Sequence, residues 1–391
     1  MKRDSEIVVI GCGIIGTAIA YYLTSVGREV LILEKSIPAA GSSGACDGTI
    51  FIQSKQPGPK LEMGLKSAKL YSDLSRTSKY SFGYKQQGGM ILIESDEEYD
   101  ILAEIVEKQQ AGGANVRLIS GEEARRSQPG LSDCVKAATW CPDDAHINPM
   151  YATLAFLNMA LDNGAEIMKD VSVIGISQKD GAVAKVVTSQ GEISTKCIVN
   201  AAGVNAVEIS SMVGLDTPVV PRKGEVVITE QIEPFLTGIY LDARYIAIKH
   251  NPKIAEKSKD PSLRKGVGMV IEQTHEGNLL IGSSREFVGF NRNTTHDVLS
   301  AISSRAVHFF PSLKRVSMIR SFAGLRPFTP DGLPYIGGTK AVKGFVVAAG
   351  HEGDGIALAP ETGRRVMEYI VNGVDEGLSE YSPDRAAKST R

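Results

Sequence analysis

Paired cysteines are missing from this sequence. The chain has 5 cysteines, an odd number, and none of them forms a Cys-x-x-Cys pair. This spacing argues against a disulfide framework, a structural zinc site and a local iron–sulfur motif. We therefore expect mostly buried free thiols at the five positions, which are Cys12, Cys46, Cys134, Cys141 and Cys197.

Long apolar runs and an excess of one charge are missing as well. The first apolar stretch, Ile7–Ile10, runs at once into glycines and is too short for a signal sequence or a membrane-spanning helix. We therefore expect a cytoplasmic protein. The 43 Lys and Arg residues and 45 Asp and Glu residues give a net charge of -2, so no overall field favours nucleic acid or an anionic membrane.

The composition is that of a soluble globular protein, with 42% hydrophobic and 23% charged residues. At 391 residues the chain exceeds the size at which a single hydrophobic core usually keeps growing, so two domains are expected. Sheet-like segments with glycine turns occur at the start, the middle and the end of the chain, separated by antiparallel-looking segments. That order predicts two interleaved domains.

The N-terminal segment predicts a βαβ unit. A β-branched run at Glu6–Ile10 is followed by the glycine turn Gly11–Gly16, a helical pattern at Thr17–Ser25 and a second apolar run at Glu29–Leu33. In such a turn the first glycine allows the bend, the second admits a pyrophosphate and the third lets helix pack on strand. The phosphates would then lie at a helix N-terminus.

An acidic residue completes this dinucleotide fingerprint. Glu34 ends the second strand, where a carboxylate can accept hydrogen bonds from a ribose diol and repels an additional phosphate. A tight turn followed by a solvated acid is the alternative interpretation. The strand before the glycines and the helix after them favour nucleotide binding.

Further elements follow from hydrophobic periodicity. The residues from Tyr245 to Lys249 predict a strand, and the polar residues 379–391 predict a frayed C-terminal tail. The segments Glu166–Gly175 and Ala182–Ser189 predict paired strands. The remaining patterns predict helices at 60–74, 97–111, 149–163, 295–310 and 355–371, and strands within 83–94, 196–200 and 344–349.

Several motifs together resemble the FAD-dependent oxidoreductases of the D-amino-acid oxidase, glycine oxidase and sarcosine oxidase family, over nearly the whole chain. Within that family the stretch from Gly266 to Gly289 resembles the FAD subunits of multi-subunit dehydrogenases of the proline and hydroxyproline type. The motifs that carry the family resemblance are Gly11–Gly16 with Glu34, Gly41–Gly48, Cys197–Gly203, Ala323–Gly337 and Gly350–Gly355.

The resemblance implies a noncovalently held FAD, because no cysteine follows Cys197 to tether it. Short side chains in the second motif would let backbone N–H groups reach the cofactor, although an ordinary flexible loop is the alternative. The residues that the resemblance places at FAD are Gly11, Gly13, Ile14, Ile15, Gly16, Glu34, Lys35, Ser42, Ser43, Gly44, Ala45, Cys46, Asp47, Gly48, Val173, Ala201, Ala202, Gly203, Arg326, Gly350, His351, Glu352, Gly353, Asp354, Gly355 and Ile356.

The resemblance also implies catalytic residues. Arg326 matches the arginine that holds the substrate carboxylate, for which a guanidinium offers two parallel donors. Tyr245 matches a carboxylate-contacting tyrosine, and His351 is a candidate for contact with flavin or substrate. A structural salt bridge, an ordinary buried aromatic and a structural histidine are the alternatives. Gly353 departs from the glycine oxidase pattern, which has a second arginine there.

The fold class that follows is α/β combined with α+β, a Rossmann-type FAD-binding domain interleaved with an antiparallel-sheet substrate domain. The expected FAD-binding domain comprises residues 1–84, 145–222 and 325–378. The expected substrate domain comprises residues 85–144 and 223–324, and residues 379–391 form the tail.

The expected reaction is hydride transfer to flavin N5 from the carbon next to the nitrogen of glycine, sarcosine, proline or hydroxyproline. Oxygen or a partner subunit would take the electrons, and a non-catalytic flavin-binding module is a further alternative. The residues Asn251–Lys265, which carry four lysines and one arginine, predict either a solvated surface loop or a docking loop for such a partner.

Overall fold

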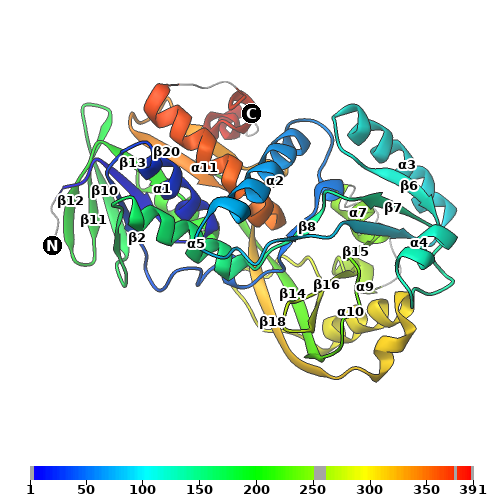
Figure 1. Cartoon of the computed structure of the whole chain (residues 1–391). Helices are drawn as coiled ribbons and strands as arrows, with labels where there is room; N and C mark the ends of the chain where they lie inside the picture. The colour runs from blue at the N-terminus through cyan, green and yellow to red at the C-terminus, as the bar shows by residue number, and fades with distance from the viewer. Residues whose placement is uncertain (1–3, 251–260, 374–376, 389–391) are drawn as a thin grey trace.

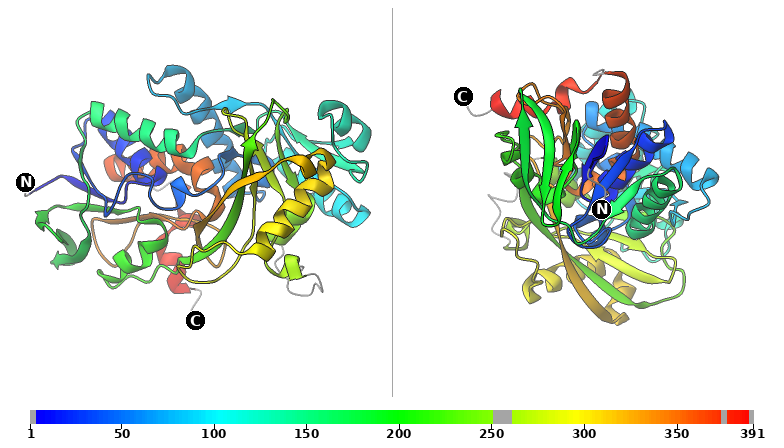
Figure 2. Two further views of the ribbon diagram at one scale, coloured as in Figure 1. Left: turned by 90° about the horizontal axis from the view of Figure 1, so that it is seen from below. Right: turned by 90° about the vertical axis from the view of Figure 1, so that its left-hand side faces the viewer.

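The computed structural model describes residues 4–250, 261–373 and 377–388, and it contains two large sheets of different kinds (Figure 1). The six-stranded sheet lies in the left half of Figure 1 and the eight-stranded sheet in the right half, and the left view of Figure 2 keeps this division. The mixed α/β fold confirms the predicted fold class. None of the helices in the described ranges combines the length and apolarity that a bilayer crossing demands.

The six-stranded sheet is parallel except for one edge strand. Its order is β19 (Tyr335–Gly338), β20 (Phe345–Ala349), β13 (Cys197–Asn200), β1 (Ile7–Ile10), β2 (Val30–Leu33) and β9 (Glu166–Met168). Only β19 runs antiparallel, against β20. The four residues of β1 are all buried because layers cover both faces, which explains the continuous apolar run in the sequence.

Helices cover one face of this sheet. Ile7 and Val9 pack with the helix residues, while Val8 and Ile10 pack against the small sheet on the other face. This alternation follows from the two-residue period of a strand. The helices are α1 (Ile14–Ser25), α2 (Pro59–Thr77), α5 (Pro149–Asp162) and α11 (Gly355–Asn372), and the opposite layer holds β10 (Val173–Lys179), β11 (Ala182–Thr188), β12 (Gly191–Ser194) and α6 (Ala206–Ser211).

The eight-stranded sheet is mainly antiparallel. Helix α10 (His296–Phe309) covers one face, and α3 (Asp96–Ala111) and α7 (Ala243–His250) cover the other. Strands β15 and β5 pair in parallel. The order is β18 (Met318–Phe328), β14 (Val220–Gln231), β17 (Asn278–Gly282), β16 (Val270–Gln273), β15 (Ile239–Asp242), β5 (Gly89–Ile93), β7 (Ala137–Cys141) and β6 (Arg117–Ser120).

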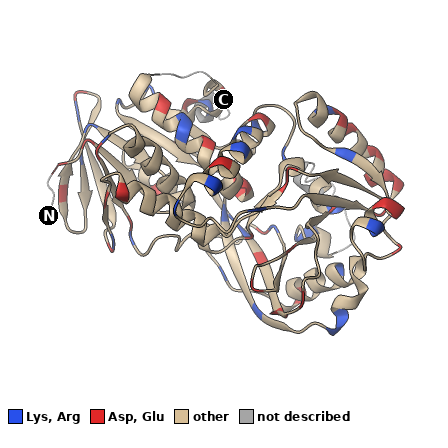
Figure 3. Ribbon diagram, in the orientation of Figure 1, with Lys and Arg blue, Asp and Glu red and all other residues tan. Residues whose placement is uncertain are grey.

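A second small sheet contains β3 (Thr49–Ile50), β8 (Ala145–His146) and β4 (Lys85–Gln86). Each of these strands comes from a segment that links the two large sheets along the chain. The short helices α4 (Gly121–Ser127) and α9 (Pro261–Arg264) lie beside the larger sheet, and the domain boundaries given above stay a prediction. Basic and acidic residues are interspersed over both halves, as the near-zero net charge indicates (Figure 3).

The βαβ unit and the five predicted helices are confirmed, but other predictions were wrong. The segment from Tyr245 to Lys249 is not a strand, because α7 starts at Ala243 and Asp242 accepts the Tyr245 N–H at 2.7 Å. The segment Glu166–Gly175 is not one strand: β9 joins the parallel sheet beside β2, and β10 pairs with β11.

The C-terminal segment is also more ordered than its polar composition indicated. Tyr381 is 1% exposed. Arg385 donates from Nε to Asp331 at 2.7 Å, and its guanidinium lies 3.9 Å from the centre of the Tyr335 ring. This pairing with residues far away in the sequence folds the described part of the segment back onto the β19 edge.

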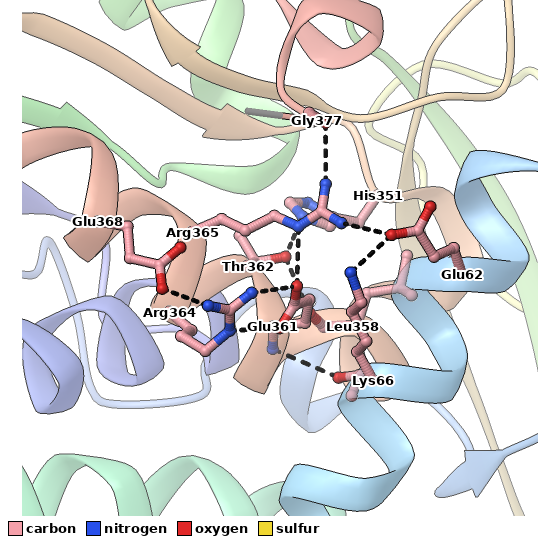
Figure 4. A network of polar contacts seen from close by, with 11 residues as sticks. Glu62, Lys66, His351, Leu358, Glu361, Thr362, Arg364, Arg365, Glu368 and Gly377 are labelled. Carbon is pink, nitrogen blue, oxygen red and sulfur yellow. Dashed lines mark hydrogen bonds and ion pairs between the residues drawn. The ribbon is translucent and has the colours of Figure 1, made fainter. Parts of the chain in front are cut away.

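Helix α11 is anchored by a buried ionic network (Figure 4). Glu361 is fully buried and accepts hydrogen bonds from Arg364 and Arg365, each at 2.8 Å. Arg365 also donates to the Gly377 carbonyl at 2.9 Å and lies 3.8 Å from Glu62 of α2. The network joins the middle of α11 to α2 and to the C-terminal segment.

Candidate active site

A cavity of about 660 Å³ runs from the carboxyl ends of β1 and β2 to the β14–β18 ladder. At the first end Glu34, Val173 and Ala202 line it. At the other end it reaches Arg326 and Phe290. An elongated cavity at the carboxyl ends of parallel strands is the usual position of a dinucleotide in such folds.

The glycine turn faces this cavity. Gly11 has φ +107°, and a Cβ atom there would lie 2.6 Å from the Ala201 carbonyl oxygen. At Gly16 a Cβ atom would collide with the Gly11 carbonyl. Gly13 is different, because its added Cβ would meet only Ser43 Oγ, at 3.2 Å, and the residue lines the cavity. The first and third glycines therefore serve packing, and the second leaves room for a ligand.

The Glu34 carboxylate is fixed at the end of β2. Its Oε2 accepts the Cys12 N–H at 2.9 Å, and its Oε1 accepts the Ser36 N–H at 2.9 Å. Glu34 lines the cavity beside Lys35. Each carboxylate oxygen has a second lone pair, so the group can still accept a hydrogen bond from a ribose hydroxyl.

The segment Gly41–Gly48, rich in small residues, crosses from the N-terminal unit to the β14–β18 ladder. Ser42 Oγ donates to the Leu325 carbonyl at 2.5 Å, and Ser43 Oγ accepts the Ile14 N–H at 3.0 Å. A Cβ atom at Gly324 would collide with the Ala45 carbonyl, so β18 approaches this backbone closely. The segment thus forms the cavity wall between the helix N-terminus and Arg326.

The N-terminal end of α11 closes another side. Gly355 and Ile356 line the cavity, and the positive end of the helix dipole therefore faces it. The preceding 3₁₀ turn is held by Asp354, whose carboxylate pairs with Lys55 and Lys60 at 2.7 Å each. All three side chains are buried.

Arg326 projects from β18 at the far end of the cavity. Its Nη1 donates to the Ser284 carbonyl at 2.8 Å, and its Nη2 donates to Ser283 Oγ at 2.6 Å. Only 15% of the side chain is exposed. The guanidinium lies against Gly224 and Gly353, where any side chain would press on it. Of its five N–H groups, the hydrogen bonds found among the described residues use two.

Two further arginines surround Arg326. Arg222 lies directly opposite it in the β14–β18 ladder and pairs with Glu352. Glu352 Oε1 also lies 3.9 Å from Arg326 Nε. Arg285 stacks on the Tyr245 ring with 3.6 Å between its guanidinium carbon and the ring centre. Arg222 and Arg285 do not line the cavity themselves. Because Arg222 compensates the charge of Glu352, Arg326 is left to bind an anionic group.

The other two predicted catalytic residues, Tyr245 and His351, differ from Arg326 in their relation to the cavity. Tyr245, on α7, interacts with the charge of Arg326 but is 8% exposed and does not line the cavity. His351 lines it, but its ring is buried and its Nε2 lies 3.1 Å from Thr362 Oγ1 (Figure 4). Burial and the nearby Lys60 lower the pKa of His351 to about 3, so the ring is neutral at neutral pH. Their catalytic roles stay predictions.

Most of the predicted cofactor residues line the cavity, and four do not. Gly16, Gly44 and Gly48 are packed against backbone, and Asp354 holds the two lysines. The sequence did not predict several other residues that line the cavity. They lie outside the motifs, and only the folded structure brings them to the cavity. They include Ser36, Thr49, Val171, Asn205, Glu208, Gly224, Phe290 and Arg292.

These features define a dinucleotide-binding protein with a charged pocket at the far end of the nucleotide cavity. The model of the FAD-dependent oxidoreductase family matches residues 6–369, so the chain belongs to that family. It is an FAD-dependent oxidoreductase, and a non-catalytic flavin-binding module is thereby set aside. The open space at Gly13, the ribose acceptor at Glu34 and the α11 N-terminus all fit FAD.

Individual relatives resemble the chain over nearly its full length. Hydrogen cyanide synthase subunit HcnC of Pseudomonas aeruginosa is 28% identical, with 93% of this chain and 91% of that protein covered. Glycine oxidase of Bacillus subtilis is 28% identical, with 95% and 94% covered. The crystal structure of L-proline dehydrogenase from P. horikoshii has a TM-score of 0.89 and 29% identity, and it covers 100% of this chain and 99% of its own.

Proposed function

We propose that the chain oxidises the C–N bond beside the carboxylate of a small amino acid or secondary amine. Glycine, sarcosine, proline and hydroxyproline are the substrate class. The observation that carries this proposal is the position of Arg326, a largely buried guanidinium with unused N–H groups at the far end of the nucleotide cavity. The relatives named for glycine and proline oxidation support the same class.

Bound FAD, held without a covalent link, supplies the hydride acceptor. The protein supplies position and electrostatics. Arg326 binds the substrate carboxylate through two N–H groups, and the serines at positions 283 and 284 hold the guanidinium in place. Gly353 lets Arg326 pack closely against the backbone, whereas a side chain at position 353 would begin with a Cβ atom 3.3 Å from Arg326 Nε. Tyr245 supports this end by stacking under Arg285.

A second candidate function is that of the FAD subunit of a heteromeric dehydrogenase. Its support is the relative named as a synthase subunit and two exposed aromatic side chains: Phe290, which lines the cavity and is 63% exposed, and Phe287, which is 59% exposed. The predicted docking loop Asn251–Lys265 falls mainly on residues 251–260, which lie outside the described residues. Oxygen uptake slower than dye reduction by the same protein would support this candidate.

A dye-reduction screen tests the proposed function without assuming an acceptor. Proline, hydroxyproline, sarcosine and glycine are each compared with a matched amine that lacks the carboxylate, such as pyrrolidine for proline. At least one of the four should show a kcat/KM about 100-fold above its matched amine, because about 3 kcal/mol of charge-assisted binding is at stake. Equal rates for acid and amine, or no turnover of any of the four, would contradict the proposal.

A further inference from the structure

We propose that Asp47 binds the amino group of the substrate and accepts its proton, so that the cavity recognises both charges of a zwitterionic amino acid. This inference rests on the proposed function, because it assigns the nitrogen end of the same substrate. Asp47 lines the cavity near the end of the segment Gly41–Gly48, shortly before β3. Its Oδ1 accepts hydrogen bonds from Thr49, at 2.8 Å from Oγ1 and 3.4 Å from the N–H.

The negative charge of the Asp47 carboxylate is not compensated by a neighbouring cation in the part of the chain that the structure describes. Glu272, which is 1% exposed, is compensated, because its Oε1 accepts the Gly48 N–H at 2.9 Å and its Oε2 lies 3.1 Å from His146 Nδ1. Although burial opposes it, Glu272 raises the pKa of His146, which favours the charged ring. Within the described ranges, Asp47 itself forms no ion pair.

A carboxylate in that position is poised to take up a proton. Burial and the neighbouring Glu272 raise the pKa of Asp47, while Thr49 and the charge of Arg326 oppose that rise. Asp47 is half-buried, and a partly desolvated carboxylate without a cation is destabilised. The ammonium group of a bound amino acid would supply the missing charge. The protein thereby favours ligands that bring a positive nitrogen with them.

Asp47 and Arg326 form a pair of opposite charges on one cavity. Both side chains line the cavity, and the charge of Arg326 acts on Asp47, so the proposed substrate would lie between them. An ammonium nitrogen has no lone pair with which to form a C=N bond. In the proposed step its N–H bond breaks, an O–H bond forms on Asp47, and the neutral amine keeps the electron pair. Arg326 holds the carboxylate meanwhile.

The variant Asp47→Asn tests this step through its pH profile. In the wild type, kcat/KM for the best amino acid should rise as Asp47 ionises and fall again when the free ammonium loses its proton. In the variant the profile should become a single rise that ends near the pKa of the free ammonium, with about 100-fold lower kcat/KM at neutral pH. Asp133→Asn is the control, because that side chain is fully exposed, and its profile should match the wild type.

Binding of acetate, followed by the visible spectrum of the FAD-loaded protein, gives a readout without turnover. Acetate offers a carboxylate to Arg326 but no cation to Asp47, so Asp47→Asn should bind acetate more tightly while it binds the amino acid more weakly. An unmoved pH profile, or a loss of both ligands together, would overturn the role of Asp47 while amino-acid oxidation by the wild type stands. No reduction of the wild type by any amino acid would overturn the proposed function as well.

Discussion

The variant Arg326→Met should lower kcat/KM for the best amino-acid substrate by about 100-fold and leave the flavin spectrum almost unchanged. The loss corresponds to about 3 kcal/mol, the scale of a charge-assisted contact in a largely desolvated site. Methionine retains much of the side-chain volume against Gly224 and Gly353, so the cavity wall is kept. The measurement is the anaerobic rate of flavin reduction over a range of substrate concentrations.

Two controls separate this effect from a general disturbance. Arg320→Met changes an exposed arginine on the same strand and should leave the kinetics unchanged. A matched amine without a carboxylate should react equally well with Arg326→Met and with the wild type. If Arg326→Met retains normal kinetics with the amino acid, another group holds the carboxylate, and the neighbouring Arg222 and Arg285 become the next residues to change.

The variant Gly13→Val should fold but lose FAD. Gly13 has φ -82° and ψ 178°, an extended backbone that valine adopts without strain, and the added Cβ meets only Ser43 Oγ at 3.2 Å. The new side chain instead enters the cavity where the pyrophosphate backbone contact is expected. The ratio of visible to ultraviolet absorbance should fall to that of apoprotein, while circular dichroism stays that of a folded chain.

Gly175→Val is the matched control for this variant. It makes the same substitution in β10, where the added Cβ meets only the Val187 side chain at 3.6 Å, and Gly175 does not line the cavity. This control should retain its FAD. Full FAD occupancy in Gly13→Val would mean that the cofactor does not lie over the glycine turn. The assignment of this cavity to FAD would then be wrong.

Local sequence patterns were sufficient to predict the N-terminal βαβ unit. They were not sufficient for α7 or for the order of the C-terminal segment. The βαβ unit has its glycines, its apolar runs and its acidic end within the first 34 residues, so neighbouring positions carry the whole signal. The alternation around Tyr245 fits a strand equally well, and only Asp242, which accepts the N–H of the first helical turn, decides for a helix. Tertiary contacts likewise order the polar C-terminal segment.

Residues of the candidate site that belong to a sequence motif could be predicted. Residues that reach the site only through contacts between distant segments could not. Arg326 stands in a recognisable stretch, and the structure places it at the cavity. Arg222 becomes its neighbour only through the register of β14 and β18. Glu272 approaches Asp47 only because the fold brings it to the Gly48 N–H. Sequence spacing of more than 100 residues in each case carries no sign of such contacts.

The central claim is that noncovalent FAD in this cavity takes its electrons from a small amino acid, and anaerobic titration of the purified protein tests it most directly. The account predicts a yellow protein that releases its flavin on acid precipitation and whose flavin absorbance bleaches on addition of proline, hydroxyproline, sarcosine or glycine, but not pyrrolidine at the same concentration. A colourless protein that FAD does not reconstitute, or a flavin that none of the four amino acids bleaches, would contradict it.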